Sequence, residues 1–361
     1  MKRCSKCLLP ETYPGITFDK EGTCNYCVTY RKVEYKGEKE LKKVLDSYRD
    51  REGDYDCLVA VSGGLDSSYA LYYIAKVCNL RVLAYTVDNG FLSREAKLNI
   101  KNLARNLNVN LVIERSNFLK RCIRSNILSW LRKPSPATIS MMCIGCKLSI
   151  DYGMYKFAKK NKIPLIITGG GGIEGESFKQ KLLRVNPNRK TFTSLVFGIF
   201  FQVLRNPSYI LNLPCLLIAI QELVFEFLIL PSRVLKKIMY PNQKRILLFD
   251  YVRWDEGHML SVLNKLGWKR STYSESPWRF DCKLSFLKNY LLKETLGFTE
   301  KDDMLSNMIR ENIITREEAL KRVEKDNIID KKAIVELFNE LGIDLSDLSK
   351  ALHKLNKLMK N

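Results

Sequence analysis

A glycine-rich turn between a hydrophobic run and a predicted helix is the feature of this sequence best suited to chemistry. Residues 56–61 read DCLVAV, and they are followed by Ser62-Gly63-Gly64-Leu65-Asp66-Ser67-Ser68. The apolar run predicts a buried strand, and the glycines let the backbone turn sharply and approach a ligand closely. Residues 66–68 begin a helix whose free N–H groups and dipole favour an anion. The sequence therefore predicts a phosphate-binding loop, although it lacks the Gly-x4-Gly-Lys-Ser/Thr spacing of a Walker loop.

Two pairs of cysteines near the start of the chain have the spacing of metal-binding knuckles. Cys4 and Cys7 form one Cys-x-x-Cys pair, Cys24 and Cys27 form the other, and sixteen residues lie between the pairs. Four thiolates at this spacing suit the tetrahedral site that structural zinc prefers. A module of this size is too small for a core of its own, so bound metal would supply its folding energy. We predict a zinc site here, with iron as the alternative metal.

Strand and helix patterns alternate after the first cysteine pairs. Apolar runs predict strands at 81–87, 110–114 and 164–168, and the segments between them predict helices at 93–107 and 118–132. This alternation is typical of an α/β fold with a doubly wound parallel sheet. Ligands of such sheets bind beyond the carboxyl ends of the strands. Asp88 and the glycines at 169–172 follow predicted strands, so we expect them near the phosphate loop.

The chain divides into five predicted segments. They are a cysteine module at 1–30, a helical linker at 31–53, an ATP-binding domain at 54–190, a hydrophobic helical insertion at 191–240 and a mainly helical region at 241–361. No uninterrupted apolar run of the insertion reaches the ~18 residues that a membrane-spanning helix needs. We expect the insertion to be buried, to face a partner, or to lie on a membrane surface.

Composition limits the class of protein and its compartment. The 361 residues are 46% hydrophobic, which excludes a disordered chain. Sixty basic and 39 acidic residues give a net charge of +21, which attracts nucleic acid, acidic lipids and phosphorylated substrates alike. Six of the eleven cysteines occur in Cys-x-x-Cys pairs or near one, and no signal peptide is apparent, which favours a reducing cytoplasm.

Two resemblances to known families follow from these motifs. The order Ser-Gly-Gly-x-Asp-Ser resembles the pyrophosphate loop of the ATP pyrophosphatases, which split ATP into AMP and pyrophosphate. Apart from 191–240, nearly the whole chain resembles the N-acetyl sugar amidotransferases of bacterial surface-glycan and flagellin-sugar pathways. The second resemblance is carried by the pattern around the cysteine module, by Met142-Cys143-Ile144-Gly145-Cys146-Lys147, by Trp278-Arg279-Phe280-Asp281-Cys282 and by residues 309–319.

The resemblance implies an ATP-dependent, AMP-forming enzyme of lipopolysaccharide O-antigen synthesis. Such an enzyme converts the acetamido group of a nucleotide-linked N-acetyl sugar into an acetamidino group. ATP adenylylates the amide oxygen, and ammonia then displaces AMP. Asp66 and Ser67 are the expected catalytic residues, with Asp66 as a ligand of Mg²⁺. The ATP-binding residues implied are Ser62, Gly63, Gly64, Asp66, Ser67, Ser68, Asp88, Gly169 and Gly170.

Three further cysteines suggest a second site. Cys143 and Cys146 form another Cys-x-x-Cys pair, and Cys282 belongs to the Trp-Arg-Phe-Asp-Cys element. Together they would form a second metal site, or ligate a [4Fe–4S] cluster as in some tRNA thiolation enzymes of this fold. A redox pair and a metal-free structural pair are the alternatives.

The partners follow from the resemblance and from what the chain lacks. Only His258 and His353 are available as histidine bases, and no glutaminase is recognisable, so the family implies that a separate glutaminase subunit supplies ammonia. We expect a cytoplasmic protein, with peripheral contact to the inner face of the membrane through 191–240.

Two rival functions remain at this stage. The first is a tRNA sulfurtransferase, which would use the same ATP chemistry and the basic surface to bind tRNA. The sequence lacks the carboxyl-terminal cysteine pairs of those enzymes, and Leu65 stands where many of their loops have lysine. The second rival is a zinc-bearing scaffold, against which the intact phosphate loop argues.

Overall fold

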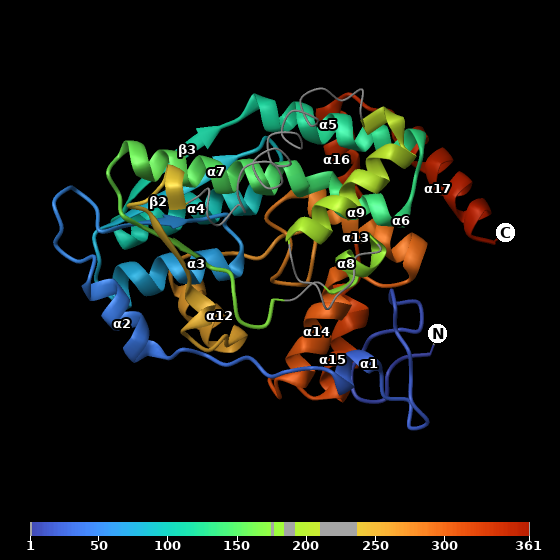
Figure 1. The fold of residues 1–361 in the computed structure, drawn as a ribbon, viewed down its shortest axis with the longest axis horizontal. Coiled ribbons are helices and arrows are strands. Elements are labelled where there is room, and N and C mark those ends of the chain that lie inside the picture. Colours follow the sequence, from blue (N-terminus) through green and yellow to red (C-terminus); the bar gives the residue numbers. More distant parts are fainter. Residues whose placement is uncertain (1, 175–176, 184–191, 210–236, 361) are drawn as a thin grey trace.

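A computed structural model describes residues 2–174, 177–183, 192–209 and 237–360. Its centre is a parallel sheet of five strands in the order β3-β2-β1-β4-β5 (Figure 1). The strands are β1 (Cys57–Ala60), β2 (Val82–Asp88), β3 (Asn110–Arg115), β4 (Leu165–Thr168) and β5 (Lys244–Leu247). The predicted α/β fold with a doubly wound sheet is thus confirmed, and each strand expected from the sequence is present within a residue or two.

The order of the strands reverses between β1 and β4. From β1 the chain proceeds through β2 to β3 on one side, and β4 and β5 are then added on the other side. In parallel sheets the crevice at such a reversal, beyond the carboxyl ends of the strands, is where ligands bind. The turn after β1 and the glycines after β4 both lie at this edge, because Ala60 pairs with Thr168 in register.

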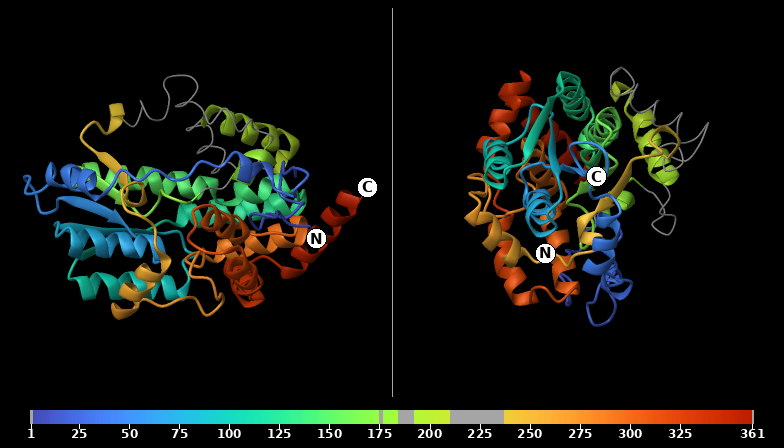
Figure 2. Two further views of the ribbon diagram at one scale, coloured as in Figure 1. Left: turned by 90° about the horizontal axis from the view of Figure 1, so that it is seen from below. Right: turned by 90° about the vertical axis from the view of Figure 1, so that its left-hand side faces the viewer.

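Helices cover both faces of the sheet. The helices nearest to it are α3 (Leu65–Tyr72), α4 (Arg94–Leu107), α5 (Asn117–Arg132), α7 (Ile144–Lys160) and α12 (Glu256–Lys265). Alternate strand residues point to opposite faces, so Leu58 and Leu83 pack with α7, whereas Val59 and Ala84 belong to the core that includes α3 and α4. Figure 2 shows α7 on one side of the strands and α3 and α4 on the other.

The C-terminal part is helical, as predicted. It consists of α13 (Lys283–Leu296), α14 (Glu300–Arg310), α15 (Arg316–Asp326), α16 (Lys331–Leu341) and α17 (Leu345–Lys360). Local signals fix its helix ends: Thr299 and Thr315 begin α14 and α15 with capping boxes, while Gly297 and Gly342 end α13 and α16 in left-handed conformation. The apolar faces of these helices join the same hydrophobic cluster as the sheet.

The remaining described helices are short or lie near the ends of the predicted segments. They are α1 (Asn25–Val28), α2 (Glu38–Asp46), α6 (Pro136–Ile139), α8 (Ser177–Leu182) and α9 (Phe192–Arg205), with a π-helix at Tyr73–Val77. Of the predicted insertion at 191–240, residues 191 and 210–236 lie outside the described residues. Its described part is α9, a short 3-10 helix at Pro207–Tyr209 and residues 237–240. In the described ranges, no helix combines the length and the apolar character needed to cross a bilayer.

The cysteine module packs against α14 rather than standing apart. Arg3 forms an ion pair of 2.8 Å with Asp302, and the Tyr13 hydroxyl donates to Asp303 at 2.9 Å. The backbone N–H of Leu8 donates to Ser306 Oγ at 3.2 Å. In Figure 1 the N-terminal segment accordingly lies beside α14 and α15.

The turn after β1 predicts one stability effect. Gly63 has a φ of +84°, and a Cβ built on it would lie 2.4 Å from the carbonyl oxygen of Ala96 in α4. We expect Gly63→Ala to lower the free energy of unfolding by about 2–5 kcal/mol, because a left-handed residue and an overpacked contact add. Chemical denaturation followed by circular dichroism measures this loss.

Gly64→Ala is the matched control. Gly64 has a φ of −73° at the N-cap of α3, and the nearest atom to its built Cβ is 3.5 Å away. This variant should stay within about 1 kcal/mol of the wild type. Equal losses for the two variants would contradict the described turn.

Candidate active site and candidate metal centre

The loop between β1 and α3 is closed by its own serines. The N–H of Ser62 donates to Ser67 Oγ at 3.0 Å, and the two hydroxyl oxygens are also 3.0 Å apart. Ser67 Oγ donates to the Gly64 carbonyl at 3.2 Å. These contacts bring both serines, which the sequence placed at an ATP site, to the first turn of α3.

Side chains from two other elements hold the carbonyl of Gly63. Asn99 Nδ2 in α4 and Trp268 Nε1 each donate to it at 3.1 Å. A trans peptide points its N–H opposite to its carbonyl, so this anchoring directs the N–H of Gly64 away from Asn99 and toward Ser62 Oγ, 3.4 Å away. The loop is therefore fixed by tertiary contacts before any ligand binds.

A cavity of about 340 Å³ opens beyond this loop; we call it the nucleotide cavity. One wall consists of the loop and strand ends that the sequence predicted, namely Ser62, Gly64, Asp66, Ser67, Thr168, Gly169 and Gly170. Gly63 and Ser68 are buried behind that wall. Close packing requires the glycine at 169, because a Cβ there would lie 2.5 Å from the Asp66 carbonyl oxygen.

The opposite wall comes from residues far along the chain. Trp278, Arg279, Asp281 and Cys282 line it, together with Glu300, Lys301 and Met304 from the start of α14. The two walls nearly meet, since a Cβ built on Gly64 would lie 3.6 Å from Asp281 Cγ. The sequence singled out residues 278–282 only as a family resemblance, and it gave no signal that Glu174, Glu300 or Lys301 would lie at the cavity.

Asp66 is the carboxylate of the loop wall. Trp254 Nε1 donates to its Oδ1 at 2.7 Å, and the Trp254 side chain is buried. Enclosure in the cavity and the nearby Glu174 carboxylate raise the pKa of Asp66 above its ordinary value. A cation at the cavity would oppose both effects, so this environment suits a residue that works beside Mg²⁺ and phosphates.

Asp88 occupies a different position from the loop residues. It ends β2, accepts a hydrogen bond of 2.9 Å from the N–H of Gly90 and lies 3.9 Å from Lys97 Nζ. Its neighbours Val87 and Asn89 contribute to the cavity lining, whereas Asp88 does not. A role for Asp88 in ATP binding stays a prediction.

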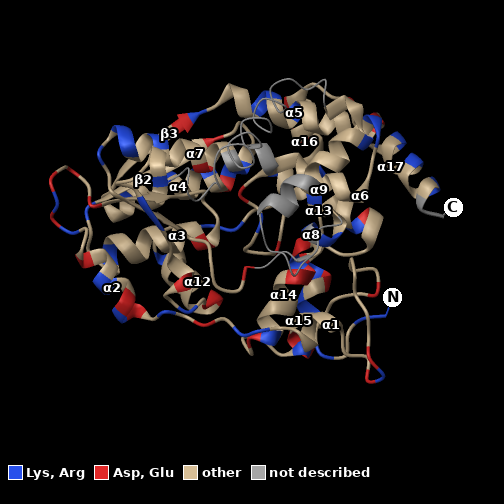
Figure 3. Ribbon diagram, in the orientation of Figure 1, with Lys and Arg blue, Asp and Glu red and all other residues tan. Residues whose placement is uncertain are grey.

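Glu300 anchors the second wall through buried ion pairs. Its Oε1 lies 3.1 Å from both Lys179 Nζ in α8 and Lys288 Nζ in α13, and its Oε2 lies 3.9 Å from Arg279 Nε. Burial opposes ionisation of this carboxyl, but the surrounding cations hold its pKa well below its usual value. Acidic residues gather at the start of α14 (Figure 3).

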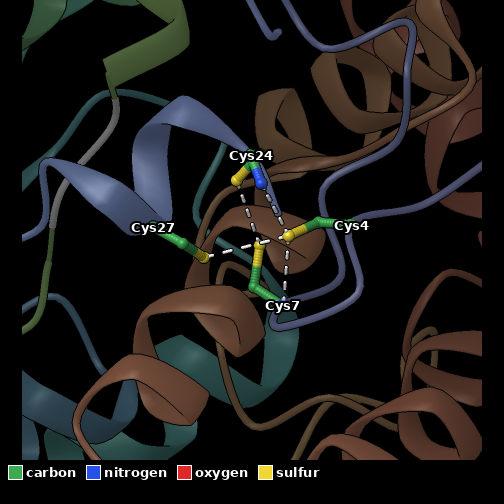
Figure 4. A group of neighbouring side chains, drawn as sticks. All are labelled: Cys4, Cys7, Cys24 and Cys27. Atoms are coloured by element: carbon green, nitrogen blue, oxygen red, sulfur yellow. Dashed lines mark hydrogen bonds between the residues drawn. The ribbon is translucent and has the colours of Figure 1, made fainter. Parts of the chain in front are cut away.

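The four cysteines predicted to bind zinc come together in space. The sulfur atoms of Cys4, Cys7, Cys24 and Cys27 all lie within 4.8 Å of one another (Figure 4). Among the described residues, this is the one group of three or more His, Cys, Asp or Glu ligand atoms at such spacing. Backbone N–H groups of the knuckles point at the sulfurs, for example from Cys24 to Cys4 Sγ at 3.2 Å. Four sulfurs with such donors suit a tetrahedral thiolate site for zinc.

Arginines of the C-terminal helices complete the surroundings of this centre. Arg310, at the end of α14, donates to Cys27 Sγ at 3.4 Å and to Cys7 Sγ at 3.3 Å. Arg316, the first residue of α15, donates to the carbonyls of Cys4 and Cys7. Because α14 begins at the nucleotide cavity and ends at the cysteines, one helix joins the two sites.

The other three cysteines are arranged more loosely. Asn89 Nδ2 lies 3.3 Å from Cys146 Sγ and 3.7 Å from Cys282 Sγ, so one amide contacts both thiols. Of the two cysteines, Cys282 lines the nucleotide cavity. Cys143, Cys146 and Cys282 do not form a group with sulfurs within 4.8 Å among the described residues. A second metal site or iron–sulfur cluster at these residues stays a prediction.

Loss of a ligand at the metal centre should be measurable directly. We expect Cys7→Ser to reduce bound zinc from near one equivalent to a small fraction and to lower the melting temperature by more than about 5 °C, since metal binding supplies folding energy here. Elemental analysis and thermal denaturation test both effects.

Cys78→Ser is the matched control for this change. Cys78 is half-buried and takes no part in the four-cysteine group. It should retain the zinc of the wild type. A Cys7→Ser protein with undiminished metal would exclude the four-cysteine site.

Comparison with known proteins adds a similarity for the part of the chain that forms the second wall. Residues 279–360 match the family described as LPS biosynthesis protein WbpG-like, C-terminal domain. The chain is also similar to the uncharacterized protein MJ1599 of Methanocaldococcus jannaschii, with 31% identity over 115 residues, which are 31% of this chain and 42% of that protein. This chain thus spans less than half the length of that relative. The C-terminal part of the chain is similar to a domain of lipopolysaccharide biosynthesis, and its first residues line the nucleotide cavity.

Proposed function

We propose that this protein is an ATP-dependent, AMP-forming amidotransferase that converts the acetamido group of a nucleotide-linked sugar into an acetamidino group. One observation carries the proposal. The phosphate-type loop after β1 and the first residues of the WbpG-like segment line the same cavity. A nucleotide loop and a wall related to lipopolysaccharide synthesis therefore face one another across a space in which two substrates can react.

The chemistry explains why ATP is needed. An amide carbon is a poor electrophile, and its oxygen is a poor leaving group. In the proposed reaction the amide oxygen attacks the α-phosphorus, the bond to the β-phosphate breaks, and pyrophosphate leaves. Ammonia then forms a bond to the imidate carbon, the carbon–oxygen bond breaks, and AMP departs with the former amide oxygen. The amidine product is protonated. The one proton that is released when ammonia replaces AMP passes to pyrophosphate or solvent.

The loop wall supplies the groups for the phosphates. Backbone N–H groups at the start of α3 and the hydroxyls of Ser62 and Ser67 would hold the polyphosphate. Asp66 would hold Mg²⁺, which neutralises charge on the phosphates when bound. The carboxylates of Asp66 and Asp281 beside an anion-binding loop fit a divalent cation, because without one they would repel the nucleotide.

The second wall would position the sugar. Arg279 and Glu174 are charged groups at the cavity that can bind the polar substrate and orient its amide toward the α-phosphate, which lowers the entropic cost of reaction. Zinc at the four cysteines would act structurally, since it holds the far end of α14 and lies outside the nucleotide cavity.

The proposal also includes the source of the ammonia and the location of the protein in the cell. A separate glutaminase subunit would supply ammonia in the cell. Phe200, Phe201 and Leu204 on α9 are 44%, 58% and 52% exposed, and this apolar surface supports peripheral contact with the inner face of the membrane. A tRNA sulfurtransferase is the alternative function, supported by the net charge of +21.

The activity is tested with purified protein, ATP, Mg²⁺, ammonium chloride at raised pH and a panel of UDP- and CMP-linked acetamido sugars. AMP and pyrophosphate formed in equal amounts, with O replaced by NH in the mass of one sugar, would support the amidotransferase. AMP release that requires tRNA and a sulfur donor would replace it with tRNA thiolation.

Asp66 and its indole partner give a sharper prediction for the same assay. Asp66→Asn should lower the rate of AMP formation by about 10²-fold or more, because the cation that offsets phosphate charge loses its ligand. Trp254→Phe should lower kcat by about tenfold with a smaller change in the KM for the sugar, because Asp66 loses only its orienting hydrogen bond. Initial rates at saturating ATP measure both.

Trp130→Phe controls for the loss of a buried indole hydrogen bond. Trp130 Nε1 donates to the Ser135 carbonyl at 3.0 Å, and Trp130 does not line the nucleotide cavity. Its kcat should match that of the wild type. A Trp130→Phe rate as low as that of Trp254→Phe would show that the effect is one of general stability.

A further inference from the structure

One of the four tryptophans differs from the others in the bonding of its indole N–H. Three of them donate to an acceptor within the protein: Trp130 to the Ser135 carbonyl at 3.0 Å, Trp254 to Asp66 Oδ1 at 2.7 Å and Trp268 to the Gly63 carbonyl at 3.1 Å. Nε1 of the fourth, Trp278, finds no acceptor among the described residues. The Trp278 side chain is 6% exposed and its Nε1 is inaccessible to water, so solvent does not replace the missing partner.

A buried donor without an acceptor requires an explanation. Burying such a group unpaired lowers the stability of a fold, and nearly all buried donors in folded proteins are therefore bonded. An indole N–H can only donate, so its missing partner must be an acceptor. Trp278 lines the nucleotide cavity. A ligand in that cavity is therefore the natural source of the acceptor.

The contacts of Trp278 hold one face of its ring and its backbone. The guanidinium carbon of Arg322 lies 4.4 Å from the ring centroid, and Arg322 is itself held by Glu256 at 2.7 Å and by Asp326 at 3.1 Å. The backbone N–H of Trp278 donates to Ser276 Oγ at 3.3 Å. Because the ring is already ordered by these contacts, a hydrogen bond from its N–H edge would cost little conformational entropy when a ligand binds.

The neighbours of Trp278 indicate which part of a ligand it would meet. The ring centroids of Trp254 and Trp278 are 6.1 Å apart, and Trp254 is bonded to Asp66 in the first turn of α3. Asp281, three residues after Trp278, lies next to Gly64, since a Cβ built on that glycine would be 3.6 Å from Asp281 Cγ. Trp278 therefore lies beside the loop and the N-terminus of α3, which favour an anion.

We propose that the indole N–H of Trp278 donates to a phosphate oxygen of a ligand in the nucleotide cavity. This inference rests on the proposed function, in which two ligands carry phosphate, namely ATP and the nucleotide-linked sugar. An ionised oxygen is the acceptor that best offsets an unpaired donor, because hydrogen bonds to charged groups are about twice as strong as those between neutral groups. Since Nε1 is covered by its neighbours, the contact requires a small tilt of the indole toward the ligand.

The indole groups can be observed separately in the full chain. In a ¹H–¹⁵N correlation spectrum each of the four tryptophans gives one indole signal, and single tryptophan-to-phenylalanine variants assign them. The probes are α,β-methylene ATP with Mg²⁺, UDP, CMP and free N-acetylglucosamine. We expect a phosphate-bearing probe to move the Trp278 signal downfield, because its proton gains a hydrogen bond. The Trp130 signal should stay in place, since Trp130 does not line the cavity.

The probes distinguish the two sources of phosphate. A downfield shift with α,β-methylene ATP assigns the bond to ATP, and a shift with UDP or CMP assigns it to the nucleotide-linked sugar. A response to free N-acetylglucosamine alone would overturn the assignment to phosphate.

The same spectra separate this inference from the proposed function. Trp254 and Trp268 report on the loop, because they are bonded to Asp66 and Gly63. If a nucleotide moves their signals and leaves that of Trp278 unmoved, the inference fails and the proposed function stands. A shifted Trp278 signal in a protein that forms no amidine supports the phosphate contact and contradicts the amidotransferase. If no probe moves any indole signal at saturating concentration, both fail.

A variant measures what the hydrogen bond contributes to affinity. Trp278→Phe should weaken binding of the probe that shifts the Trp278 signal by about tenfold or more in titration calorimetry, because a hydrogen bond to a charged group is lost. Trp130→Phe is the matched control, since it also removes a buried indole but lies outside the cavity lining. It should bind the probe as the wild type does.

A closer substitution separates the hydrogen bond from the packing of the ring. Incorporation of 3-benzothienylalanine at position 278 keeps a bicyclic ring of the same shape and replaces the N–H by sulfur. We expect this protein to lose affinity for the probe as Trp278→Phe does, although the contact with Arg322 is retained. Wild-type affinity in this protein would overturn the inference.

Discussion

The packing of α14 between the cysteine module and the nucleotide cavity is the constraint on which both sites depend. Its first residues, Glu300 and Lys301, line the nucleotide cavity, and its last residue, Arg310, donates to two cysteine sulfurs. A rigid helix transmits a shift at one end to the other. The four-cysteine group therefore contributes to the cavity without lining it, by fixing the position of the second wall.

The buried charges around Glu300 fit this positional role. Removing one carboxylate and its lysine partners from water costs several kcal/mol per ion, and such groups often add little net stability. Their geometry is nonetheless demanding, because Lys179, Lys288 and Arg279 approach Glu300 from three different segments. We interpret these ion pairs as the contacts that fix the positions of α8, α13 and residues 278–282 around the start of α14.

Local sequence patterns were enough for the sheet, the glycine turn after β1 and the cysteine group. A short apolar run, two glycines and a helix start determine the turn after β1 largely by themselves, and Cys-x-x-Cys spacing predicts a knuckle in the same way. The second wall could not be predicted, because Glu174, Arg279 and Glu300 meet only through long-range packing. The prediction at Asp88 identified the correct strand end. Its neighbours Val87 and Asn89 enter the cavity lining and Asp88 does not, a distinction that depends on how the backbone runs at the end of β2.

The two walls present different kinds of groups to the cavity, and this difference connects the fold with the proposed chemistry. In the proposed function the loop wall would bind phosphates mainly through backbone groups and short side chains, so the same wall could serve any enzyme that splits ATP in this manner. The second wall is built of long charged side chains on a segment similar to a lipopolysaccharide biosynthesis domain, and long charged side chains discriminate among substrates. Asp281 lies next to Gly64 at the seam between them. In the proposed function, a substrate bound by the second wall would therefore lie beside a phosphate bound by the first, which is the geometric condition for transferring an adenylyl group instead of hydrolysing ATP.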